Sequence, residues 1–293
     1  MSVSELRIIP ATEVVEDVKF RADRAQLSGT LFRPAGTPKA AIVLHGATGV
    51  PHRFYRHFAG WLAEQGYACL TYDYRDFGAS ASGPMKRSKA TMADWGVLDQ
   101  SAAQRALEGA VPGVPVWVIG HSLGGLMVPF QEGASRIGRL ISVASGPTHL
   151  FDHPWPYRAV AAAFWYGPGA WATRLMGYLP AKALRIGADL PAGVYWQWRR
   201  WCTTRSFYLG DVGRGLPVPD WKAFSGAMKV VAIEGDDLVP PVTVWRGMEH
   251  YPEASKRQFT VRPSDYGLKQ VGHIGVFAPQ NAVIWPSLIA HTT

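Results

Sequence analysis

The chain has 293 residues, of which 47% are hydrophobic, so it can bury a sizeable core and is too apolar for an intrinsically disordered protein. Its formal net charge is +8, but the lysines and arginines are dispersed among acidic residues, which argues against a nucleic-acid-binding surface. Two cysteines, no secretory signal at the N-terminus and no apolar stretch of membrane-spanning length predict a cytoplasmic protein without disulfides or stable membrane insertion.

The predicted elements alternate between strands and helices after a first antiparallel hairpin. The hairpin covers residues 14–33, where apolar and polar residues alternate weakly. The strands that follow are predicted at residues 40–44, 67–72, 114–119, 140–144 and 229–233, and the helices at 54–65, at 91–109 and directly after Ser122. Short strands that are apolar on both faces and alternate with helices are typical of a parallel sheet covered on both sides.

Residues 147–225 differ in character from the rest of the chain. They hold seven of the twelve tryptophans, are rich in glycine and proline, and carry nine Lys and Arg against four Asp and Glu. We expect a mostly helical cap inserted between two core segments, 1–146 and 226–293. The positive excess fits an anionic substrate, such as a carboxylate or a coenzyme A thioester, and it fits a solvated basic surface equally well.

The tryptophans of this segment allow two interpretations. An aromatic face turned toward a pocket would hold an acyl or aromatic group, and the region around Trp196 and Trp198 is the best candidate for such a face. The same side chains could instead form the internal core of the cap. We take Trp196 and Trp198 as candidate substrate-binding residues.

The most informative motif is Gly120-His-Ser-Leu-Gly124, which fits G-x-S-x-G and follows an apolar strand. A strand, a sharp turn with a central serine and then a helix form the layout of a nucleophile elbow. The turn is strained, and side chains two positions either side of the serine would collide with neighbouring backbone, which explains the glycines. Ser122 is therefore the candidate nucleophile.

A serine nucleophile needs a general base and a group that orients that base. In chain order Ser, acid, His, the acid is expected after the strand at 229–233, where Asp236 and Asp237 stand, and the base at His273 in a glycine-flanked loop. We place Asp236 first and Asp237 second. The alternatives without a catalytic role are that the aspartates cap the next helix and that His273 is a surface residue.

The tetrahedral intermediate also needs two donors for its oxyanion. One is expected from the backbone N–H of Leu123 and the other from Ala47, with Thr48 as second choice, in the loop after the strand at 40–44. His45, at the start of that loop, is a candidate substrate-binding residue. Because no metal-ligand spacing, P-loop or dinucleotide motif occurs, we expect neither a metal nor a cofactor.

Together these motifs resemble the α/β-hydrolase superfamily, and most closely its serine-aminopeptidase-like and monoacylglycerol-lipase-like branch. The shared segments, in the family's order, are Leu44-His-Gly, Thr71-Tyr-Asp-Tyr-Arg75, Gly120-His-Ser-Leu-Gly-Gly125, Asp236-Asp-Leu-Val-Pro and Gly272-His273. The resemblance implies an α/β-hydrolase fold, with a mostly parallel eight-stranded sheet, helices on both faces and a helical cap. The family's acid pattern aligns on Asp236 without a gap. One departure is Asp76, where the family usually has glycine.

The function expected from this reading is hydrolysis of a carboxylic ester or thioester through an acyl-enzyme on Ser122, with a small acyl ester as partner. An acyltransferase would use the same triad, and a peptidase would need a residue dedicated to a free N-terminus, which is not evident. A ligand-binding protein on a hydrolase core is the non-enzymatic alternative, although all three triad candidates are intact. The sequence leaves the natural substrate and self-association into homo-oligomers open.

Overall fold

A computed structural model describes residues 14–290, so the N-terminal residues behind the expectation about a secretory signal lie outside the described part. Its strands are β1 Val14–Ala22, β2 Ala25–Arg33, β3 Ala41–His45, β4 Ala68–Tyr72, β5 Val116–His121, β6 Ile137–Val143, β7 Tyr178–Leu179, β8 Leu190–Pro191, β9 Ala227–Ile233 and β10 Ser255–Val261. Its α-helices are α1 Arg56–Glu64, α2 Gln100–Ala110, α3 Leu123–Leu126, α4 Tyr157–Tyr166, α5 Pro168–Met176, α6 Ala192–Cys202, α7 Pro241–Gly247, α8 Gly272–Gly275 and α9 Trp285–Ile289.

Eight strands form one sheet in the order β1-β2-β4-β3-β5-β6-β9-β10. β1 pairs with β2 and β2 with β4 in antiparallel register, whereas the other neighbours are parallel. The predicted hairpin and mostly parallel eight-stranded sheet are thus confirmed. Since parallel strands end at the same edge, the loops that follow β3, β5, β6 and β9 gather there.

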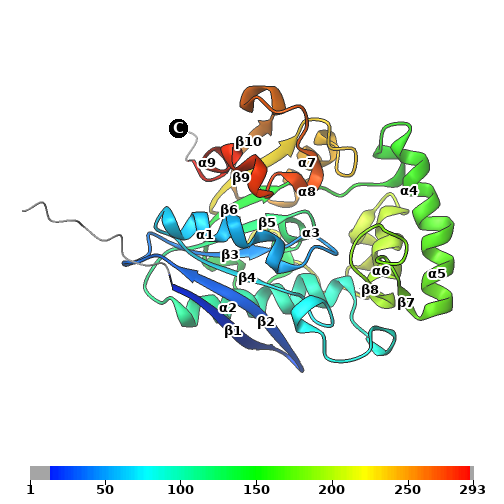
Figure 1. Ribbon diagram of the computed structural model, residues 1–293, viewed down its shortest axis with the longest axis horizontal. Coiled ribbons are helices and arrows are strands. Elements are labelled where there is room, and N and C mark those ends of the chain that lie inside the picture. The colour runs from blue at the N-terminus through cyan, green and yellow to red at the C-terminus, as the bar shows by residue number, and fades with distance from the viewer. Residues whose placement is uncertain (1–13, 291–293) are drawn as a thin grey trace, which may run out of the picture.

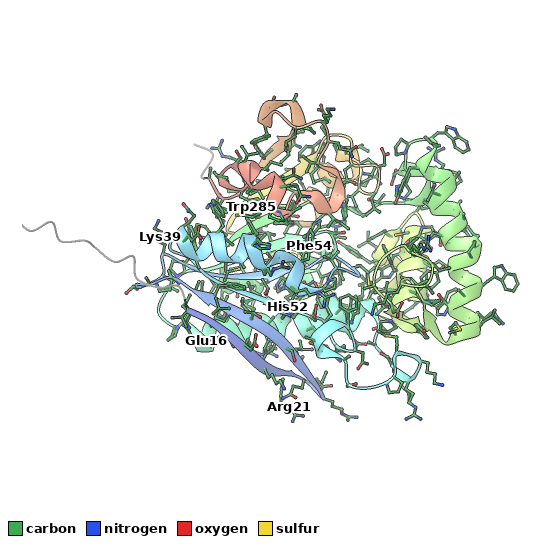
Figure 2. The ribbon with its side chains drawn as sticks, viewed as in Figure 1. Glu16, Arg21, Lys39, His52, Phe54 and Trp285 are labelled. Carbon is green, nitrogen blue, oxygen red and sulfur yellow. The ribbon has the colours of Figure 1, made fainter. Side chains whose placement is uncertain are left out.

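Both faces of the sheet are buried. Successive residues of each central strand point to opposite sides, and neighbouring residues join different parts of the core. In β3, Val43 joins the core on one face and Leu44 the core on the other, and β5 divides Val118 and Ile119 in the same way. Figure 1 shows α1 and α9 on one side of the sheet and α2 on the other. The labelled Trp285 lies over α1 in Figure 2, and its ring centroid is 5.4 Å from that of Phe58.

Two predicted helices differ from the structure, and one strand of the sheet was not predicted. The helix after Ser122 is a single α-helical turn, because Pro129 follows within a 3₁₀ turn and cannot continue an α-helix. The helix expected at 91–109 begins with a π-helical segment, Asp94–Asp99, before α2. β10 was not predicted, because its sequence Ser-Lys-Arg-Gln-Phe-Thr-Val is polar at a sheet edge.

The segment expected to form a cap contains α4, α5 and α6, a two-stranded sheet of β7 and β8, and a 3₁₀ helix at Phe207–Asp211. In Figure 1 it lies beside the sheet, with α4 and α5 outermost and α6 between them and the core. No helix within residues 14–290 is both long and apolar enough to cross a bilayer.

Candidate active site

Ser122 occupies a strained turn between β5 and α3. Its φ of 55° and ψ of −115° lie in a region that L-residues rarely adopt, at a cost of about 1–3 kcal/mol. The glycines around it allow the turn to pack closely. A Cβ on Gly120 would lie 2.5 Å from the carbonyl carbon of Gly124, and one on Gly124 would lie 2.0 Å from the carbonyl oxygen of His45. These distances confirm the prediction that a side chain at Gly120 or Gly124 would collide with neighbouring backbone.

Replacing Gly124 by alanine is expected to disturb both the fold and any Ser122 chemistry. The new Cβ would push the end of β3 and the loop after it, so we expect a loss of about 1–3 kcal/mol in the free energy of unfolding. Thermal unfolding and esterase assays measure the two effects. Gly138→Ala is the matched control, since its Cβ would lie 3.6 Å from the nearest atom, in ordinary contact.

Asp236 and His273 come together in the structure, although 36 residues separate them along the printed sequence. The Nδ1–H of His273 donates to Oδ2 of Asp236 over 2.8 Å, and Oδ1 of the same carboxylate accepts the N–H groups of Leu238 and Val239 over 2.9 and 3.1 Å. Asp236 is 2% exposed, so the hydrogen bonds of its carboxylate are shielded from water. This arrangement fixes the His273 ring with its proton on Nδ1 and leaves Nε2 free to accept a proton.

The side chain of Asp237, the second candidate acid, is exposed, unlike that of Asp236. Its carbonyl oxygen instead accepts the Nδ1–H of His153 over 2.9 Å. The two aspartates thus have separate partners, and only Asp236 meets His273. Spacing ranked Asp236 first, and the geometry agrees with that order.

A directed hydrogen-bond chain joins the elbow to the His273 loop. His121 Nε2 lies 3.0 Å from the carbonyl oxygen of His273, which can only accept, so the His121 proton is on Nε2. His121 Nδ1 therefore accepts from the hydroxyl of Tyr55, 2.8 Å away. Burial holds the pKa of His121 well below its ordinary value, so the ring is neutral. The rings of His121 and His273 are 5.0 Å apart, which places His273 beside the residue that precedes Ser122.

The same Tyr55 hydroxyl corrects the oxyanion prediction. The N–H of Ala47 donates to it over 2.9 Å, so the first-choice donor is already engaged. Within residues 14–290, the N–H groups of Thr48 and Leu123 have no hydrogen-bond partner in the protein. Thr48, the second choice, lines the same cavity as Ser122 and Leu123 and replaces Ala47 as the candidate.

Ser122 lies at a cavity of about 290 Å³. The cavity walls come from the loops after β3, β5, β6 and β9 and from the segment that holds α4 to α6. Most lining side chains are apolar, and those from residues 147–225 include Val160, Phe164, Trp165, Leu190, Trp198, Trp201 and Phe207. Such a cavity suits an apolar group bound next to the serine.

Two predicted substrate-binding residues are placed elsewhere, which corrects those predictions. His45 is fully buried below the loop, where Nδ1 hydrogen-bonds to the Tyr72 hydroxyl over 2.8 Å and burial lowers its pKa to about 3. Trp196 packs on Tyr195 and under Arg199 instead of lining the cavity. Trp198 does line it, beside Trp165 at a ring distance of 5.0 Å.

The positive charge of residues 147–225 lies outside the cavity. Among the described lining residues there is no Lys, Arg, Asp or Glu. Arg199 donates to the carbonyl of Trp165, and Arg200 pairs with Asp211. Of the two interpretations of the basic excess, this favours a surface property over recognition of an anionic substrate.

Sequence reasoning missed Tyr55, His121 and His153. Tyr55 and His121 stand in apolar patterns that indicate core positions, and nothing in their spacing shows that they hydrogen-bond to each other. His153 follows a 3₁₀ turn, Leu150–Asp152, in a loop, and only the fold brings it to Asp237. Buried polar side chains of this kind leave no periodic signal.

Comparisons with known proteins agree with the fold. The model of the "Alpha/beta hydrolase family" matches residues 41–284. A curated relative, "Quorum-quenching protein AidA" of Acinetobacter baumannii (strain MDR-ZJ06), is 34% identical over 115 residues, which are 37% of this chain and 36% of that protein. The match thus spans about a third of that relative's length.

Solved structures resemble the chain over almost its whole length. The α/β hydrolase GrgF from Penicillium sp. sh18 has a TM-score of 0.59 at 20% identity, covering 94% of this chain and 96% of that one. The Pyrococcus furiosus esterase Pf2001 has a TM-score of 0.59 at 15% identity, covering 95% and 89%. The thioesterase domain from the curacin biosynthetic pathway has a TM-score of 0.53 at 16% identity, covering 94% and 100%. At these identities the likeness concerns the fold. With the family match over residues 41–284, the eight-stranded sheet and the elbow at Ser122, the chain belongs to the α/β-hydrolase family.

Proposed function

We propose that this α/β hydrolase cleaves carboxylic esters or thioesters with an apolar acyl group, through an acyl-enzyme on Ser122. The observation that carries the proposal is that a serine on a strained turn lines an apolar cavity next to a buried Asp236–His273 pair. Related folds that are called esterase or thioesterase support the same reaction class.

In the proposed mechanism, Ser122 Oγ attacks the substrate carbonyl while His273 Nε2 takes its proton. The N–H groups of Leu123 and Thr48 donate to the oxyanion that forms. His273 then gives the proton to the leaving alcohol or thiol, which departs and leaves the acyl group on Ser122. A water molecule, deprotonated by His273, attacks this ester, and the acid is released with Ser122 restored. Asp236 holds the imidazole in the required tautomer and stabilises the imidazolium.

The apolar lining and the lack of charged side chains among the described cavity residues favour a neutral acyl group. A volume of about 290 Å³ lies just below the usual range of ligand pockets, about 300–1,000 Å³, which favours short or medium chains. Hydrolysis of p-nitrophenyl esters from acetate to palmitate tests the chain length, and a comparison of neutral with anionic esters of equal chain length tests the charge. The name of the A. baumannii relative supports a second set of test substrates, namely quorum-sensing signals that contain an ester bond. Product analysis with an added alcohol separates hydrolysis from acyl transfer.

Trp198→Leu is expected to shift the chain-length preference toward longer acyl groups, because a smaller side chain at the cavity wall leaves more room. The ratio of kcat/KM for decanoate to that for butanoate should rise about tenfold. Trp196→Leu removes a half-buried tryptophan of the same helix that does not line the cavity, and it should leave this ratio unchanged. Equal shifts in both variants would show that Trp198 acts through the packing of α6 instead of through the cavity.

A further inference from the structure

The cavity contains a polar side chain that the proposed mechanism does not use. His153 lines it, is only 6% exposed, and lies in the loop between β6 and α4. Its Nδ1 donates to the carbonyl oxygen of Asp237, which cannot donate in return, so the ring proton is on Nδ1. The lone pair of Nε2 is then the remaining polar feature of the ring.

The ring is neutral, and Nε2 is unsatisfied by the protein. Burial lowers the pKa of His153 below its ordinary value. Among the hydrogen bonds of residues 14–290, none involves His153 Nε2. By contrast, the hydroxyl of Thr148, another polar lining group, is bonded to Thr243 Oγ1 over 2.8 Å. An acceptor that a bound ligand covers without donating to it lowers the affinity of that ligand.

The position of His153 in the cavity determines which part of a bound substrate it would contact. Asp237 directly follows Asp236, which holds His273, so His153 stands on the acid–base side of the cavity. The ring of Tyr157 lies 5.3 Å from it, edge to face, and also lines the cavity. The remaining walls come from the loops after β3, β5 and β9 and from apolar side chains of the segment that holds α4 to α6. Because His153 is bonded to the residue next to Asp236, we expect a donor that reaches it to lie nearer the reacting bond than the far end of an acyl chain.

We propose that His153 Nε2 is a hydrogen-bond acceptor subsite for an N–H or O–H group next to the scissile carbonyl of the substrate. This inference rests on the proposed esterase function and narrows its substrate class to esters or thioesters that carry such a donor, for example N-acyl amino esters. Plain acyl esters bind the same cavity without satisfying His153.

The test compares two substrates that differ in one group: the methyl ester of N-butanoylglycine, and its analogue in which CH₂ replaces N–H. Each is measured as a substrate and as a competitor of p-nitrophenyl butanoate hydrolysis, so that slow turnover does not conceal binding. His153→Asn is the informative variant, because its amide NH₂ can still donate to the Asp237 carbonyl while the Nε2 acceptor is lost. His153→Gln reaches the Nε2 position and is expected to restore part of the preference.

We expect wild type to favour the N–H ester, and His153→Asn to lower kcat/KM for it, or raise its inhibition constant, about tenfold. The CH₂ analogue should change by less than about twofold, and the Tm should stay near that of wild type. Equal losses for both substrates would mean that His153 only positions the Asp237 loop, and no loss for either would mean that it does not meet the substrate. Either result overturns the subsite, as does a wild type without preference. The proposed function fails separately, if wild type does not hydrolyse p-nitrophenyl butanoate.

Discussion

Replacing Ser122 by alanine is expected to lower kcat for ester hydrolysis by about 10⁴-fold or more, with KM little changed. The variant removes only Oγ, the atom that forms the acyl bond. Alanine at φ 55° carries the same backbone strain as serine, so the turn between β5 and α3 should keep its shape. The p-nitrophenyl ester with the highest wild-type kcat/KM gives the widest range for this measurement.

A Tm close to that of wild type is the control for folding. Retention of more than about a hundredth of the wild-type kcat by a folded Ser122→Ala protein would contradict an acyl-enzyme at this residue. It would direct attention to another nucleophile or to general-base hydrolysis by His273.

Asp236→Asn is expected to lower kcat by about 10³- to 10⁴-fold while the protein stays folded. The asparagine oxygen can still accept the N–H groups of Leu238 and Val239, which now bond to Oδ1 of the aspartate. Its NH₂ group would then face His273 Nδ1 and force the ring proton onto Nε2. In that tautomer His273 cannot accept the proton of Ser122.

Asp237→Asn is the matched control for this change. It alters the neighbouring residue in the same way, but the Asp237 side chain is exposed and its carbonyl, which His153 uses, is untouched. Activity should stay within about twofold of wild type. A large loss in Asp237→Asn with an active Asp236→Asn would reverse the assignment of the acid.

The sequence predicted the central part of the fold because the signals there are local. Strands that are apolar on both faces, such as β3 and β5, can only be buried in a covered sheet. The glycines around Ser122 indicate that backbone segments approach closely there. The structure agrees, because a Cβ on Gly120 or Gly124 would lie too close to backbone atoms. The chain order of serine, acid and histidine predicted Asp236 and His273, whose side chains hydrogen-bond to each other in the structure.

The errors arise where a partner distant in sequence decides the outcome. Ala47 was chosen as an oxyanion donor from its place in the loop, but the hydroxyl of Tyr55, from the turn before α1, takes its N–H. His45 follows a strand in a loop that borders the site, yet Tyr72 of the next strand draws its ring into the core. Neither contact has a periodicity or spacing that the sequence could reveal.

Residues 147–225 show that the sequence also cannot separate the roles of side chains of one type. Trp196 and Trp198 stand two residues apart on α6, so they project from different sides of the helix. Composition alone gave both the same role, whereas only Trp198 lines the cavity, together with Trp165 and Trp201. Which tryptophans face a pocket depends on how α4 packs on α6, and that is decided by tertiary contacts.

Labelling with a fluorophosphonate, followed by peptide mass mapping, tests the central claim most directly. We predict that one phosphonyl group is added to the peptide that contains Ser122, that ester hydrolysis falls in proportion to labelling, and that Ser122→Ala is not labelled. A label on another residue, or hydrolysis that persists when Ser122 is fully labelled, would contradict the account.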